Sequence, residues 1–105
     1  MDKKPTAIQS NITEEIKVNI PDSKPITVNG YTLTANNISY EHLINGGNAS
    51  LCTLKVESNQ GSFVLELERD HSKSVEFSTI FDFQIGLESV SAYNEQSANV
   101  ILKPK

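Results

Sequence analysis

The chain has 105 residues, a length that suits one domain with a single hydrophobic core. Apolar residues make up 37% of it, with no Trp, one Met and one Cys, a lean composition that fits strands burying one face each. The formal net charge of -4 and the single arginine argue against nucleic acid as the main partner, because phosphate binding needs clustered Lys and Arg.

Residues 1–15 are mostly polar and without sustained periodicity, which predicts a flexible N-terminal tail ahead of one domain at residues 16–105. The tail contains no signal peptide. Residues 2–5, Asp-Lys-Lys-Pro, resemble the stretch that follows the lipidated cysteine of bacterial lipoproteins, with Met1 in place of that cysteine. The resemblance implies an exported, lipid-anchored protein of the periplasm or cell envelope. The alternative is a cytoplasmic protein for which Met1 is the natural start.

From residue 16 onward the apolar period is two, which is typical of strands with one buried face. The strands predicted in the first half are residues 16–20, 26–28 and 31–40. Pro21 ends the first of these strands, and Asn29-Gly30 is a strong signal for a two-residue hairpin. Between Ala35 and Ile38 the apolar spacing is three, as expected where a β-bulge adds one residue to a strand.

The same period continues through the second half of the chain. The strands predicted there are residues 52–56, 63–67, 75–77, 81–92 and 98–102. A four-residue turn from Ser58 to Gly61 joins the first two as a hairpin. Leu87 to Val90 repeats the three-residue step and predicts a second bulge. No segment shows helical spacing over more than two turns.

Two stretches, residues 16–54 and 65–102, read as imperfect copies of one another. The Ser-Lys turns that begin at Ser23 and Ser72, together with the shared three-residue steps, carry most of the likeness. Accidental matching of alternating strands between Asn, Ser and Gly turns is the other explanation. The pattern predicts an all-β fold, an antiparallel β-sandwich or open barrel of seven to eight short strands, with an internal pseudo-two-fold repeat as an option.

Residues that carry common catalytic or metal chemistry are sparse. Cys52 occupies an inward position on a predicted strand, which favours a small buried side chain over a reactive thiol. His42 and His71 are the only histidines, and neither lies in a nucleophile-elbow sequence. Closely spaced Cys and His pairs and calcium-loop sequences are absent from the chain. We therefore expect no catalytic residue, no metal and no cofactor.

Comparison of the two copies identifies loops that a shared scaffold does not require. The stretch from Ile38 to Cys52 is four residues longer than its counterpart in the second copy, and the excess falls at residues 41–48. Leu43 and Ile44 interrupt this polar, glycine-rich turn, which makes them candidate anchors for a partner. The alternative is that these two side chains cap the core. The predicted partner-binding residues are Tyr40, His42, Leu43 and Ile44.

A second excess in length falls at residues 78–82. Core packing is favoured there, because Phe81 continues the alternation of Phe83 and Ile85.

Taken as a whole, the sequence favours a non-catalytic binding domain that recognises a protein partner by loop tips or an exposed strand edge. The predicted strands contain little proline that would protect their edges from pairing with another chain. No apolar run approaches the ~20 residues needed to cross a bilayer, so no transmembrane segment is expected. The alternative function is a small acidic inhibitor of a secreted hydrolase. An enzyme whose carboxylates or histidines converge only in the fold, and an assembly subunit, are further options.

Overall fold

The computed structural model describes residues 12–105, so most of the predicted tail, including residues 2–5, lies outside the described part of the chain. Residues 12–105 form eight strands and no helix, and hence no helix that could cross a membrane. The strands are β1 (Ile16–Pro21), β2 (Ile26–Val28), β3 (Tyr31–His42), β4 (Asn48–Ser58), β5 (Gly61–Asp70), β6 (Phe77–Ile80), β7 (Phe83–Ser91) and β8 (Ser97–Pro104).

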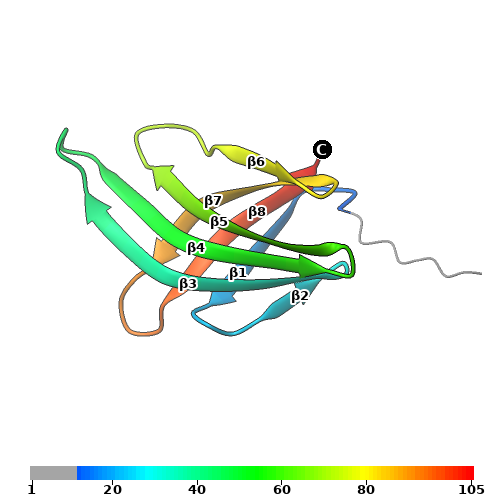
Figure 1. Ribbon diagram of the computed structural model, residues 1–105. Helices are drawn as coiled ribbons and strands as arrows, with labels where there is room; N and C mark the ends of the chain where they lie inside the picture. The colour runs from blue at the N-terminus through cyan, green and yellow to red at the C-terminus, as the bar shows by residue number, and fades with distance from the viewer. Residues whose placement is uncertain (1–11) are drawn as a thin grey trace, which may run out of the picture.

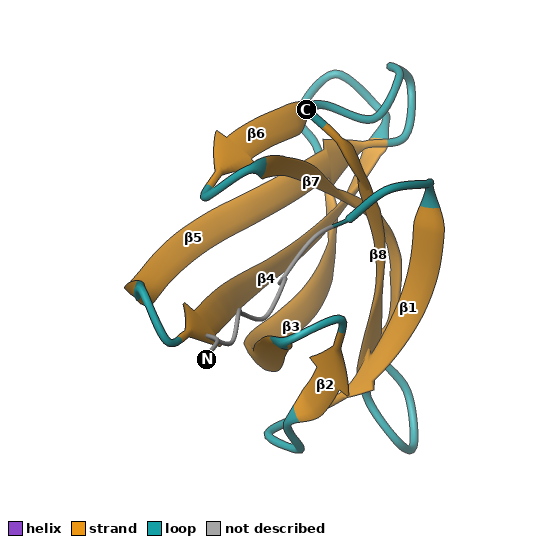
Figure 2. Ribbon diagram, turned by 90° about the vertical axis from the view of Figure 1, so that its right-hand side faces the viewer, coloured by secondary structure: helices purple, strands orange, loops and turns teal. Residues whose placement is uncertain are grey.

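The strands form two four-stranded antiparallel sheets that pack face to face (Figure 1). Sheet I has the order β1-β8-β7-β6, and sheet II has the order β2-β3-β4-β5. Figure 2 shows the two layers from the side, with β5 and β6 at one lateral opening and β1 and β2 at the other. The predicted antiparallel β-sandwich is confirmed.

The core lies between the sheets and is built from the inward side chains of each strand. Its fully buried apolar members are Ile20, Leu33, Ala35, Leu54, Val56, Phe83, Ile85, Ala98, Val100 and Leu102. The period of two places these side chains on one face, and their removal from water drives the packing of the sheets. Ile12 is also buried, so one residue of the predicted tail packs within the core.

The strand order is the same in both sheets once every strand number is shifted by four. Under that shift, β1-β8-β7-β6 becomes β5-β4-β3-β2, which is the order of sheet II read from the opposite edge. The first and second halves of the chain therefore contribute strands to matched places. In particular, β1 and β5 are both edge strands, and each pairs with the central strand that closes the other half of the chain, β1 with β8 and β5 with β4.

Both predicted bulges are present. The register of β3 against β4 shifts between Asn36 and Ser39, and the register of β7 against β8 shifts between Leu87 and Ser89. Asn37 within the first bulge has a φ of 53°, a left-handed conformation that Asn tolerates better than most residues.

Two predicted boundaries are wrong. β6 begins at Phe77 rather than at residue 75, because Val75 belongs to the connection that crosses from sheet II to sheet I. Phe81 does not continue β7: it lies in the turn between β6 and β7 with a φ of 49°. Its ring nevertheless packs against the core, as expected, because the turn directs it inward.

The extra length of the second half also lies at another place than residues 78–82, where the sequence predicted it. Two residues join β2 to β3, and two residues, 81–82, join β6 to β7. The hairpins therefore match in length, and the second half is longer in the crossing between its first two strands. Residues 71–76 join β5 to β6, whereas residues 22–25 join β1 to β2.

Connections gather at the two ends of the sandwich. Residues 43–47, 71–76 and 92–96 lie at one end, which we name the loop end (Figure 1). The β4–β5 and β6–β7 turns lie at the opposite end with the C-terminus and the start of β1.

Candidate functional site

The longest edge strand in the sandwich is β5. It has 10 residues, against 6 in β1, 4 in β6 and 3 in β2. Among residues 12–105 only β4 pairs with β5, which leaves its second edge uncovered by any described strand. We name this the free edge of β5. A long edge strand carries a row of backbone N–H and C=O groups available to another chain.

Side chains alternate along β5, so that one row points toward sheet I and the other points outward. The inward row is progressively covered: Phe63 is 43% exposed, Leu65 is half-buried and Leu67 is buried. In the outward row, Val64 is 63% exposed and Glu66 is exposed. Apolar surface is therefore open to solvent at the N-terminal half of the strand, on both of its faces.

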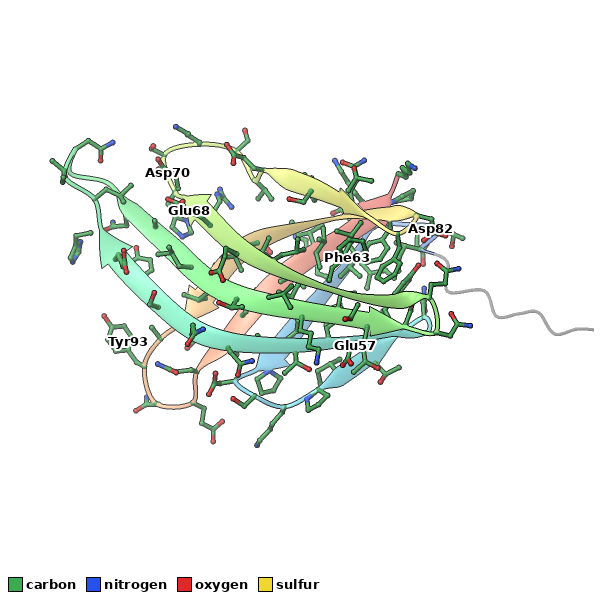
Figure 3. All side chains as sticks on the ribbon, viewed as in Figure 1. Glu57, Phe63, Glu68, Asp70, Asp82 and Tyr93 are labelled. Carbon is green, nitrogen blue, oxygen red and sulfur yellow. The ribbon has the colours of Figure 1, made fainter. Side chains whose placement is uncertain are left out.

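An aromatic cluster holds this apolar end in place. The ring of Phe63 meets Phe81 edge-on at a centroid distance of 4.8 Å, and Phe81 lies 5.4 Å from Tyr31. The hydroxyl of Tyr31 donates to Asp82 Oδ1 at 2.6 Å. The turn that holds Phe81 and Asp82 in sheet I is thus tied to both β3 and β5 of sheet II. Figure 3 labels Phe63 and Asp82 at this end of the sandwich.

The C-terminal half of β5 is acidic. Figure 3 shows Glu68 and Asp70 close together where β5 meets its connection to β6. A cavity of about 130 Å³, which we name the acidic pocket, lies here. Its lining residues are Glu68, Asp70, Lys73, Ser74 and Glu76. Three carboxylates against one ammonium give the pocket a negative lining.

Local hydrogen bonds fix the turn beside this pocket. The hydroxyl and the backbone N–H of Ser72 donate to Asp70 Oδ1 at 2.7 and 2.9 Å. These two bonds, the hydroxyl bond first, lower the pKa of Asp70, because they stabilise its charged form. The N–H of Lys73 donates to the backbone oxygen of Asp70 at 2.9 Å and closes the turn.

Arg69 braces the same region from the inward side of β5. Its Nε donates to the backbone oxygen of Lys73, and one of its terminal nitrogens donates to the backbone oxygen of Glu88, both at 3.1 Å. One guanidinium therefore links β5, the β5–β6 connection and β7, and holds the wall of the acidic pocket.

The predicted loop site lies at the tip of the β3–β4 hairpin. The tip is ordered by three bonds: Leu43 N–H to Gly47 oxygen at 2.7 Å, Gly46 N–H to Leu43 oxygen at 3.0 Å, and Gly47 N–H to Asn45 Oδ1 at 2.9 Å. Ile44 is completely exposed and Leu43 is half-buried. Ile44 therefore does not cap the core.

Tyr40 and His42, the other two predicted partner-binding residues, lie at the end of β3 and are exposed. His42 Nδ1 lies 2.6 Å from Asn48 Oδ1 across the hairpin. The ring of Tyr40 lies 5.9 Å from that of His71, which follows β5. The structure thus brings Tyr40 close to the β5–β6 connection, a proximity that sequence spacing does not indicate.

His71 also forms a contact of the kind used in nucleophilic catalysis. Its Nε2 lies 2.7 Å from the hydroxyl oxygen of Ser50, within the range for a base and a nucleophile. Ser50, however, has no exposed surface. The bond satisfies a buried hydroxyl and anchors the connection, together with the bond from His71 N–H to Asn48 oxygen at 2.9 Å.

Cys52 is 2% exposed, as its inward position predicts. Burial raises the pKa of its thiol to about 11, and the charge of Glu66 adds to the shift. The thiol is consequently protonated and unreactive at neutral pH. Over residues 12–105, no group of three His, Cys, Asp or Glu side chains gathers in a way that would hold a metal ion.

The free edge of β5 could not be located from the sequence. Alternation at residues 63–67 indicates a strand with an acidic outward row, and the sequence shows that this strand lacks proline. Which strands lie at the edges is set by the topology, which links residues far apart in the chain. The available signal was the repeat, because matched halves place their first strands alike.

Comparison with known proteins yields no relatives: no family model matches the chain, and neither a curated protein nor a solved structure matches it.

Proposed function

We propose that this protein is a non-catalytic binding domain that takes up an extended segment of a protein partner as an added strand on the free edge of β5. The observation that carries this proposal is the pairing of β5 on one side only, among the described strands, over a length of 10 residues. In strand addition, backbone hydrogen bonds supply affinity and alternating side-chain contacts supply specificity.

The exposure of β5 supports this choice over the other three edges. Strands of three or four residues, such as β2 and β6, offer few backbone groups, and β1 ends in a proline. β5 instead exposes Phe63 and Val64, whose apolar surface an added strand would cover.

As to its setting, the proposed domain is exported or lipid-anchored in a bacterial cell envelope, with the residues ahead of the buried Ile12 as the tether. The support is the resemblance of residues 2–5 to the start of a mature lipoprotein. Fractionation of cells expressing the natural gene, with mass spectrometry of the mature N-terminus, tests this. A lipidated cysteine before Asp2 is the expected finding, and an unmodified chain that begins at Met1 in the cytosol refutes it.

Strand addition is tested by amide hydrogen exchange. The probe is a nine-residue peptide that alternates Val and Thr, and the control is the same peptide N-methylated at every second residue. We expect the plain peptide to slow exchange at β5 amides and leave β1 amides unchanged, because only β5 gains a partner. Equal effects of both peptides, or no protection at β5 at millimolar peptide, would show that β5 does not accept a strand.

Ile44 favours a second candidate function, the inhibition of a secreted hydrolase. Its side chain is fully exposed at the tip of an ordered hairpin, a placement suited to entering a substrate cleft. Assay of lysozyme and a panel of proteases with the protein and with its Ile44→Asp variant separates the two functions. Inhibition that the substitution abolishes would establish the second function, and full enzyme activity throughout would exclude it for those enzymes.

A further inference from the structure

We propose that the segment which adds to β5 is basic at its N-terminal end and apolar toward its C-terminal end. This inference rests on the proposed strand addition and names the chemistry of the partner. Two independent features of β5 carry it: the apolar surface at one end of the strand and the negative charge at the other.

Charge complementarity decides the partner at the C-terminal half of β5. Glu66, Glu68 and Asp70 succeed one another in the outward row, about 7 Å apart by strand geometry. Thr53, on the neighbouring strand, donates to Glu66 at 3.1 Å, but Thr53 brings no positive charge. Lys or Arg at alternate positions of an added strand would lie directly opposite these carboxylates, and Glu or Asp there would be repelled.

The acidic pocket adds a place for one long basic side chain. It lies at the end of the free edge, between Glu68 and Asp70 on β5 and Glu76 on the crossing to β6. Its volume of about 130 Å³ accepts an extended side chain, and the Ser74 hydroxyl provides a further acceptor beside the carboxylates. Arginine is the better fit, because its planar group presents several donors to carboxylates on different sides.

Apolar contacts determine the other end of the segment. Phe63 and Val64 are exposed on opposite faces of β5, so an added strand would meet apolar surface on both faces there. Side chains facing Phe63 and Leu65 would extend the core at the lateral opening between β5 and β6. Valine and isoleucine suit such positions, since their branched side chains pack well on a pleated surface.

The direction follows from the pairing of the sheets. Every strand pair of sheets I and II is antiparallel, and antiparallel pairing is the slightly more stable arrangement. A segment antiparallel to β5 places its first residues opposite Asp70 and its last residues opposite Ser62. The basic positions therefore come first and the apolar positions follow.

The test uses a designed nine-residue peptide, Lys-Thr-Arg-Val-Lys-Val-Val-Val-Thr, which places its basic residues opposite Asp70, Glu68 and Glu66. The matched control is the same composition in reverse order, and a third peptide replaces the basic residues by Glu. Calorimetry at two salt concentrations measures affinity for the full chain. We expect the forward peptide to bind at least about tenfold more tightly than the other two, with the difference shrinking at high salt.

Protein variants locate the contact. Glu68→Gln combined with Glu76→Gln should weaken the forward peptide about fivefold and leave the Val/Thr peptide unchanged, because only charge contacts are lost. Glu95→Gln, in the exposed β7–β8 connection, is the control and should change neither affinity. Equal binding of forward, reversed and Glu-containing peptides would overturn the inference while leaving strand addition intact. The absence of β5 protection by any peptide would overturn both.

Two other occupants of the edge are outcomes of the same study. If the protein sediments as a dimer that Val64→Lys dissociates, a second copy occupies β5 and the inference is wrong. If the forward peptide binds only after removal of residues 1–11, that segment of the chain occupies the edge, and the inference is again wrong.

Discussion

The first strands of the two halves, β1 and β5, occupy matched places, but they differ in length and in the side chains that they expose beside the free edge. Each is an edge strand paired with one central strand, β1 with β8 and β5 with β4. β1 has 6 residues and ends at Pro21, while β5 has 10 and ends in a charged turn. The outward row of β1 is polar, with Lys17 and Asn19, and that of β5 includes exposed Val64.

The chain after β1 turns at once across the sandwich. The N–H of Asp22 donates to Gln96 oxygen at 2.9 Å, and the N–H of Ser23 donates to Ala35 oxygen at 2.8 Å. These bonds end the strand and attach the chain to the β7–β8 connection and to β3. β5 has no such early tie and runs on to Arg69 and Asp70. The comparison indicates that the scaffold requires only a short strand at this place, and that the extra length of β5 is available for the strand addition that we propose.

The largest expected effect on stability concerns the longer connection that follows β5, residues 71–76. A Cβ on Gly86 would lie 2.6 Å from Val75 Cγ1 and 2.8 Å from the backbone oxygen of Glu76. Gly86→Ala should therefore destabilise the protein by about 3 kcal/mol, because backbone must move. Urea denaturation measures it. Thr34 holds the matched position in β3 and already has a side chain, so Thr34→Ala should change stability by less than about 1 kcal/mol. Equal losses of stability for Gly86→Ala and Thr34→Ala would mean that the β5–β6 and β1–β2 connections do not differ in how closely they pack on the neighbouring strand.

The second-largest effect on stability is expected from replacing Arg69. Arg69→Met removes two hydrogen bonds from a charged group and should lower the free energy of unfolding by about 1 to 2 kcal/mol. Exchange at the amides of residues 71–76 should rise as the crossing loosens. Lys17 on β1 forms an exposed 3.7 Å ion pair with Glu88, so Lys17→Met should change stability by less than about 0.5 kcal/mol. A larger loss for Lys17 than for Arg69 would contradict the bracing role.

Cys52 lies opposite Leu67 of β5, at the place where Val100 lies opposite Val18 of β1. The ordinary pKa of 9.0 rises to about 11 in the fold, so above pH 9 the unfolded chain releases the proton first and stability falls toward pH 11. At pH 10 this loss should be about 1 kcal/mol. Denaturation of Cys52→Val, which copies the other half, should lack this part of the pH dependence. Identical pH profiles would show that the thiol does not titrate differently in the fold.

Exchanging the edge residues should alter association more than stability. Val64→Lys places an outward lysine on β5, as Lys17 does on β1, and should therefore reduce aggregation on heating. It should change the free energy of unfolding by less than about 0.5 kcal/mol. Lys17→Val does the reverse for β1, but the short strand should limit the gain in aggregation. Light scattering during a thermal ramp compares them. A greater increase from Lys17→Val than the decrease from Val64→Lys would show that strand length does not determine edge exposure.

The smallest effect concerns the turn that ends β5. The pKa of Asp70 is lowered by Ser72, so its contribution to stability is present above the ordinary carboxyl pKa and disappears as pH falls through the lowered value. NMR titration of the Asp70 side chain should give a midpoint below that of an exposed Asp. Ser72→Ala should raise this midpoint, because both the hydroxyl and the turn geometry are altered.

Much of the fold was predictable because local pattern decides it. The alternation identified all eight strands, and the three-residue steps identified both bulges. Phe81 was misplaced because a bulky residue in a left-handed turn is rare, and only its packing with Phe63 and Tyr31 explains the conformation. Val75 was misplaced because alternation continues through it although its side chain lies over Gly86.

The candidate site was less accessible to sequence analysis. Two apolar residues in a polar turn left two options for Ile44, an exposed anchor or a cap on the core, and its full exposure in the structure excludes the cap. The free edge of β5 depends on β4 lying at one side and on no described strand at the other, a relation between distant segments. The contact of Tyr40 with His71 and the bond of Ser50 to His71 join residues 21 or more positions apart for the same reason.

The position of β8 between β1 and β7 has a consequence for how the chain acquires its structure. Sheet II consists of β2 to β5, which follow one another, so consecutive hairpins can assemble it early. Sheet I places its first strand against its last, with Ile16 opposite Leu102. During synthesis β1 therefore lacks its partner until residues 97–102 have been made, so sheet I is completed later than sheet II can be.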